Sequence, residues 1–165
     1  MKNEVMKVFN TYTEALSKGD FGEVFKTIAD DIVWHMGGES SLSGVIVGKQ
    51  ALGKRLSEFT ERSKGTFRII INWAASNDCF VAASVISLAE RGEEKLKNPG
   101  IDLFRIENGK IQEVWTFGEL QEEEDRFWEW EKKPIVAKKS FAIGFFTNSY
   151  NSYIPIFSNF IIEFF

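Results

Sequence analysis

The chain has 165 residues, of which 44% are hydrophobic and 27% charged, a composition that indicates a globular protein and excludes a disordered or fibrous chain. Its net charge of -4 argues against nucleic acid or an anionic membrane as a partner, because neither attracts an acidic surface. The single cysteine, Cys79, cannot form an internal disulfide. Charges interrupt the N-terminal segment, so it offers no apolar stretch typical of a secretory signal, and we expect a cytoplasmic protein.

The composition changes at Pro134. Residues 134–165 hold 7 of the 16 Phe but only three charged residues, whereas residues 1–133 have the composition expected of the folded domain. Polar residues and Pro155 interrupt the apolar tail, so no run long enough to cross a membrane remains. We interpret 134–165 as a read-through or frame-shifted end without a selected role, with a membrane-surface or partner-binding tail as the alternative.

Helical periodicity recurs three times in the first half of the chain. Apolar spacing predicts a first helix that ends at Gly19. Asp20 is a suitable N-cap, with Glu23 at the capping-box position, for a short second helix that runs through Ile28. The next expected elements are a strand at 32–36, a loop at 37–44 and a third helix at 49–62.

After residue 66 the hydrophobic period changes to two, which is typical of strands. Four strands are expected at 67–73, 79–89, 101–107 and 110–117, followed by a short helix at 119–131. Asn108-Gly109 is a strong signal for a tight hairpin turn. Helices followed by an antiparallel meander predict an α+β fold rather than a parallel, doubly wound sheet.

No glycine-rich phosphate loop, nucleophile elbow or set of metal ligands occurs in the sequence, so we expect neither a cofactor nor a metal. Asp102 is the strongest candidate for a catalytic residue, because alternation places it on the same strand face as the apolar residues Phe104 and Ile106. A desolvated carboxyl resists ionisation and can donate a proton near neutral pH. The alternatives are a buried Asp that is hydrogen-bonded to a neighbouring strand or turn, or an error in the assumed alternation at a sheet edge after Pro99-Gly100.

Tyr12 lies on the apolar face of the first helix, where it is either a core tyrosine or a hydrogen-bond donor that shares a cavity with Asp102. His35 is a candidate proton carrier. Simple alternation places it opposite Trp34 and Met36, and only a bulge before Gly37-Gly38 would turn it to the apolar face. The candidates to line a ligand cavity, all of which are also ordinary core residues, are Trp34, Met36, Trp73, Phe104 and Trp115. The acidic run Glu122–Asp125 is interpreted as a solvated helix face.

Four segments together resemble the SnoaL-like and ketosteroid-isomerase-like members of the nuclear transport factor 2-like superfamily. They are YTEALSKGDFGEVFKTIADDIVWHMGG, LSGVIVGKQAL, GTFR and IDLFRIENGKIQEVWTF, and the resemblance covers residues 1 to about 130. It implies a cone-shaped α+β fold, in which N-terminal helices pack on a strongly curved antiparallel sheet around an apolar cavity. It also implies a homodimer formed through the outer sheet face.

The resemblance assigns the oxyanion-hole tyrosine of the isomerase to Tyr12 and its protonated aspartate to Asp102; that enzyme is a known example of a carboxylic acid kept neutral by an apolar site. The general base of the isomerase falls on Met36, which cannot accept a proton. One hypothesis is therefore an isomerase or polyketide-cyclase-type enzyme that acts on a hydrophobic carbonyl compound, with His35 moving the proton. The other is a non-catalytic ligand-binding or dimerisation module.

Overall fold

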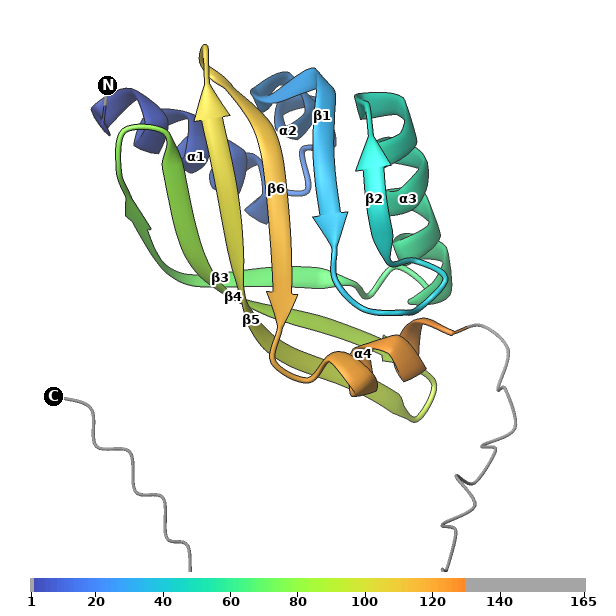
Figure 1. The fold of residues 1–165 in the computed structure, drawn as a ribbon. Coiled ribbons are helices and arrows are strands. Elements are labelled where there is room, and N and C mark those ends of the chain that lie inside the picture. The colour runs from blue at the N-terminus through green and yellow to red at the C-terminus, as the bar shows by residue number, and fades with distance from the viewer. Residues whose placement is uncertain (1, 130–165) are drawn as a thin grey trace, which may run out of the picture. The chain divides into compact units, whose positions relative to one another are not determined.

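The computed structural model describes residues 2–129, which form four helices and six strands (Figure 1). The elements are α1 (Lys2–Ser17), α2 (Phe21–Thr27), β1 (Ile28–Met36), β2 (Gly44–Val47), α3 (Lys49–Arg62), β3 (Arg68–Ser76), β4 (Phe80–Arg91), β5 (Glu94–Glu107), β6 (Lys110–Gly118) and α4 (Gln121–Trp128). The apolar tail expected at 134–165 lies outside the described residues. Among the helices that are described, none is both long and apolar enough to span a membrane.

The six strands form one sheet in the order β2-β1-β6-β5-β4-β3. All neighbours are antiparallel except β1 and β6, which run parallel. The predicted four-stranded antiparallel meander is confirmed as β3 to β6, whereas the parallel pair is a correction to the antiparallel sheet that was expected. Its physical reason is that hydrophobic alternation fixes which face a residue occupies but carries no information on the direction of a neighbouring strand.

Several element boundaries also differ from expectation. Ile28 begins β1 instead of ending the second helix, and the expected loop is followed by a short strand, β2, that pairs with β1. β5 begins at Glu94, earlier than expected, because Leu96 and Asn98 already alternate inward and are buried. The turn at Asn108-Gly109 is confirmed, since both residues have the positive φ that a tight hairpin needs.

The sheet is strongly curved, with β4 and β5 bending along their length (Figure 1). Helix α1 packs its apolar side on the concave face, where Phe9 lies 5.2 Å from Phe104 between ring centroids. A second cluster near α4 surrounds Trp128, which packs edge-on against Phe59 and Phe67. The architecture is therefore α+β and cone-like, with helices covering the concave face of a sheet that is not closed.

Candidate ligand-binding site

A cavity of about 170 Å³ lies between the concave face of the sheet and the helices. Its wall is mainly apolar and is formed by residues from all four helices, from β1, β3, β4, β5 and β6, and from the loop that follows β1. A cavity of roughly 150 Å³ is sufficient to hold benzene. The space inside this domain therefore suits a ligand of one or two rings.

Tyr12 and Asp102, the two residues with the strongest chemical expectation, both line this cavity. Tyr12 is buried on α1 and its ring centroid is 5.6 Å from that of Phe104 on β5. Burial, and then the charge of Asp102, raises the pKa of Tyr12 well above its ordinary value. The hydroxyl therefore keeps its proton, and it can act as a hydrogen-bond donor throughout the physiological range.

Asp102 is half-buried on β5, on the same face as Phe104. Burial, and then the charge of Glu124, raises the pKa of its carboxyl to about 7. Within residues 4–129, no side chain or backbone group forms a hydrogen bond with the Asp102 carboxyl or the Tyr12 hydroxyl. Both groups are therefore free to bond to a molecule inside the cavity.

Trp34, Met36 and Phe104 also line the cavity, as expected from alternation along their strands. Trp34 is 8% exposed, and its Nε1 is the one buried side-chain polar atom in the described part of the chain that lacks a hydrogen-bond partner. An unsatisfied donor of this kind costs about 1–3 kcal/mol. The mainly apolar wall thus holds the unpaired Trp34 N–H in addition to the Tyr12 hydroxyl and the Asp102 carboxyl.

His35 and Trp115 lie on the opposite, outer face of the sheet, so the structure does not bring them to the cavity. His35 is paired in register with Trp115, and the two rings stack with centroids 5.2 Å apart and an interplanar angle of 1°. His35 Nε2 lies 2.8 Å from Glu113 Oε1. The irregularity in β1 falls between Ile28 and Val33, ahead of His35, so nothing reverses the alternation from Trp34 to Met36.

Trp73, another expected cavity residue, is 55% exposed and lies outside the cavity lining. A register shift between Ile71 and Trp73 explains this correction, because it puts Trp73 beside Ser84 on the outer face. Ile71 still lines the cavity. A bulge within a regular apolar alternation leaves no clear mark in the sequence.

The outer face is rich in apolar side chains exposed to solvent. Val45, Trp73 and Ile101 are among the exposed large hydrophobic residues, and all three project from this face by register. Half-buried Trp115 lies between the strands that carry them. An apolar surface that extends over several strands is typical of a face that is covered by another molecule.

Glu124 and Asn98 are cavity residues that the sequence interpretation missed. The run Glu122–Asp125 was expected to be a solvated helix face, but only Glu122 and Glu123 are exposed, whereas Glu124 and Asp125 line the cavity. Helical spacing was the available signal, since Glu124 precedes the buried pair Phe127 and Trp128 by three and four residues on α4.

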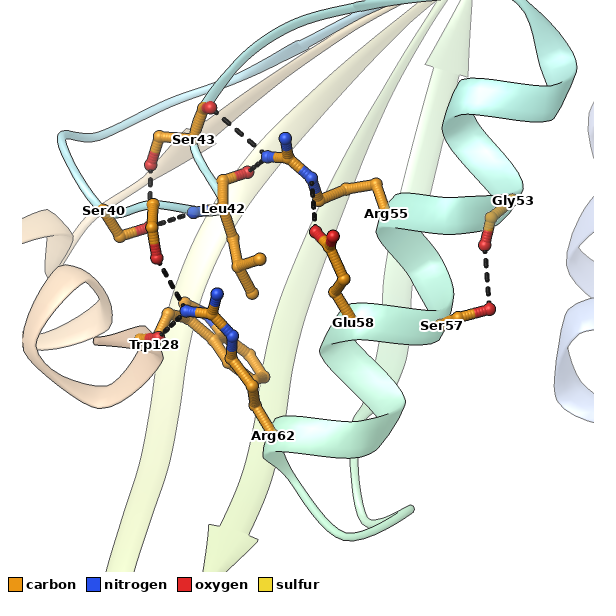
Figure 2. A network of polar contacts seen from close by, with 10 residues as sticks. Ser40, Leu42, Ser43, Gly53, Arg55, Ser57, Glu58, Arg62 and Trp128 are labelled. Carbon is orange, nitrogen blue, oxygen red and sulfur yellow. Dashed lines mark hydrogen bonds and ion pairs between the residues drawn. The ribbon is translucent and has the colours of Figure 1, made fainter. Parts of the chain in front are cut away.

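The loop between β1 and β2 closes one side of the cavity through Ser40, Leu42 and Ser43. Arg55 on α3 donates to the carbonyl groups of Leu42 and Ser43, as Figure 2 shows. Arg62 lies two helical turns further along α3 and donates a hydrogen bond to the Trp128 carbonyl of α4. The two arginines therefore tie the loop and α4 to the same helix.

No group of three or more His, Cys, Asp or Glu side chains with metal-binding geometry occurs among the described residues. The site is instead composed of an apolar wall with a few hydrogen-bonding groups.

A family model described as the SnoaL-like domain matches residues 9–114. A protein of unknown function with a cystatin-like fold from Xanthomonas campestris shares 32% identity with a TM-score of 0.72, covering 76% of this chain and 98% of that chain. Bal32a, from a soil-derived mobile gene cassette, shares 20% identity with a TM-score of 0.73, covering 78% and 98%. A putative polyketide cyclase from Xanthomonas campestris pv. campestris shares 20% identity with a TM-score of 0.57, covering 73% and 94%.

No curated protein matches this chain. The last two structural neighbours show the fold alone, whereas the family model covers more than half of the sequence and the first neighbour is also similar in sequence. The chain therefore belongs to the SnoaL-like domain family.

Proposed function

We propose that the cavity binds a small apolar molecule that carries a carbonyl oxygen, and that Tyr12 and Asp102 donate hydrogen bonds to this oxygen. The observation that carries the proposal is that two groups able to donate a proton face one apolar cavity and are bonded to no other described residue. A pKa of about 7 keeps much of the Asp102 carboxyl protonated near neutral pH. Donors in a site that excludes water contribute more than they would in solution.

The same donor pair supports an isomerase or polyketide-cyclase type of activity, because negative charge that develops on a carbonyl oxygen would be stabilised by both hydrogen bonds. A neighbour described as a putative polyketide cyclase is in keeping with this chemistry. The alternative, a binding module without catalysis, is favoured by one observation. Met36 stands in the cavity wall at the position to which the resemblance assigns the general base, and a thioether does not accept a proton.

We test the donor pair with 2-indanone, a two-ring ketone, by calorimetric titration of the wild type, Asp102→Leu and Tyr12→Phe at pH 6, because neither leucine nor phenylalanine has a side-chain hydrogen-bond donor. Each substitution removes one proton donor with little change of shape, and we expect each to weaken binding about tenfold, the value of one hydrogen bond to a polar ligand. Asp31→Leu, at an exposed carboxyl outside the cavity, is the matched control and should bind as the wild type does. Equal affinity in all four proteins would exclude the donor pair.

We further propose that the protein is a homodimer that forms through the outer sheet face and resides in the cytoplasm. The exposed apolar residues on that face support the dimer, since water contact with them is unfavourable in a monomer. The free Cys79 is in keeping with a reducing compartment.

A further inference from the structure

Glu124 brings a second carboxyl into the cavity that holds Asp102. The two residues come from different elements, α4 and β5, and both belong to the cavity lining. They lie close enough for the charge of Glu124 to raise the pKa of Asp102. A ligand whose carbonyl oxygen bonds to Asp102 would therefore have a second carboxyl beside it.

Two donors hold the Glu124 carboxyl in place. Asn98 Nδ2 lies 2.6 Å from Glu124 Oε2, and Trp128 Nε1 lies 3.3 Å from Glu124 Oε1. The orientation of the Asn98 amide is fixed, because its Oδ1 accepts a hydrogen bond of 2.8 Å from the Leu120 N–H. Asn98 itself is 2% exposed, so this arrangement is built into the core.

These donors give the two carboxyls different roles. Burial raises the pKa of Glu124, while the hydrogen bonds from Trp128 and Asn98 oppose that rise because they stabilise the ionised form. Asp102 receives no such bond from residues 4–129. When the pair shares one proton, that proton is therefore favoured on Asp102, and Glu124 remains an acceptor.

Gly118 provides the space for this contact. A Cβ atom at residue 118 would lie 2.3 Å from Asn98 Nδ2 and 2.9 Å from Glu124 Oε2, both closer than atoms of a side chain approach one another. Helix α4 is also held by β4, because Arg91 on that strand donates a hydrogen bond of 2.7 Å to the Phe127 carbonyl. The carboxyl of Glu124 is thus positioned by Asn98 and Trp128, in a space that a side chain at residue 118 would fill.

We infer that Glu124 is the proton acceptor of an acid–base site, in which Asp102 and Tyr12 hold the oxygen of a ketone while Glu124 takes a proton from the adjacent carbon. This inference rests on the proposed function, because it requires the ketone to bond to Asp102 and Tyr12.

The reaction requires only the ketone and the side chains of the site. As the proton moves to Glu124, the C–H electron pair forms a carbon–carbon double bond and the carbonyl π pair moves onto the oxygen, where Tyr12 and Asp102 stabilise it. Glu124 then returns the proton to a conjugated carbon, which completes an isomerisation, or it first exchanges the proton with solvent and delivers a solvent proton to the original carbon. The outcome is exchange or isomerisation, and it requires no oxidant or cofactor. The substrate class is an apolar ketone with an acidic C–H bond.

The test measures deuterium uptake by 2-indanone in D₂O, by NMR, relative to a blank without protein. We expect the wild type to accelerate uptake and Glu124→Gln to reduce the acceleration about 100-fold or more, the contribution of a general base. Binding of 2-indanone, measured by calorimetry on the same samples, should change little. Glu123→Gln, at the exposed neighbour on α4, is the matched control and should retain the wild-type rate.

Glu124→Ala provides a second variant, because the shorter side chain leaves room for a small carboxylate. Added acetate should restore uptake in this variant and have no comparable effect on Glu123→Ala, a result that a purely structural Glu124 would not give. If the wild type binds 2-indanone but Glu124→Gln exchanges it as fast as the wild type, the role of Glu124 is refuted and the binding proposal stands. Absence of binding to the wild type would overturn both.

Discussion

The buried environment of Asp102 links the protonation of its carboxyl to the stability of the fold. Its pKa rises from 3.8 to about 7, so the folded protein binds this proton more tightly than the unfolded chain does. The sign of the linkage follows: the contribution of Asp102 to the unfolding free energy is greatest at acid pH, where the carboxyl is protonated in both states, and it declines as pH rises through this interval. Ionisation of a carboxyl that is held away from water destabilises the fold.

Asp102→Asn removes this dependence. We expect the variant to gain stability relative to the wild type as pH rises from 4 to 8, by up to about 4 kcal/mol and by less where water in the cavity solvates the carboxylate. Urea unfolding at several pH values measures the difference. Asp31→Asn, at an exposed site, should show no such trend, and parallel curves for wild type and Asp102→Asn would contradict the assigned environment of Asp102.

The placement of individual residues could be predicted wherever alternation was unbroken. Asp102 and Phe104 share the cavity face as their spacing on one strand implies, and His35 lies on the other face from Trp34 for the same reason. Trp73 could not be placed, because a bulge ahead of it reverses its side without altering the apolar pattern. The inward position of Glu124 could have been predicted from its helical spacing to Phe127 and Trp128, but the run of acidic neighbours led to the prediction of an exposed face.

The loop after β1 is held by a carboxyl group on helix α4. The Asp125 carboxyl accepts hydrogen bonds from the backbone N–H groups of Glu39, at 2.9 Å, and Ser40, at 3.2 Å. These bonds satisfy backbone donors of a loop that has no strand partner of its own.

Asp125→Ala should therefore lower the unfolding free energy by about 1–3 kcal/mol, the cost of leaving such donors unsatisfied. The amide of Ser40 should also exchange with solvent faster, which hydrogen-exchange NMR detects. Glu122→Ala, at an exposed position on the same helix, serves as the reference. Identical stability and exchange in the two variants would show that the loop does not depend on Asp125.

The elements themselves were largely predictable, but their pairing was not. The helices and the long strands have clear periodicity, and Asn108-Gly109 specifies its hairpin locally. The parallel pairing of β1 with β6 joins residues that are 80 or more positions apart in the sequence, and no local pattern encodes it. Strand β2 was missed because four residues are too few to establish a period.

At the scale of the whole molecule, the outer sheet face determines the expected assembly. Trp73→Glu and Val45→Glu place charge at two exposed positions on that face, and each should convert the proposed dimer to a monomer because a buried, unpaired carboxylate is strongly unfavourable. Sedimentation velocity measures the change. Phe21→Glu makes the same replacement at an exposed residue of α2, on the helical side, and should leave the dimer intact. A wild type that sediments as a monomer would refute the dimer.

The parallel pair has a consequence for the order in which the chain can fold. β1 forms near the start of the sequence, yet one of its two neighbours, β6, is the last strand of the sheet. On a ribosome, β1 can pair with β2 early, but its other edge stays unpaired until residue 118 has been synthesised. Closing such a distant pair is slow, and an unpaired strand edge invites association with other chains. Completion of β6 is thus the step that ends the period in which the nascent chain is vulnerable to aggregation.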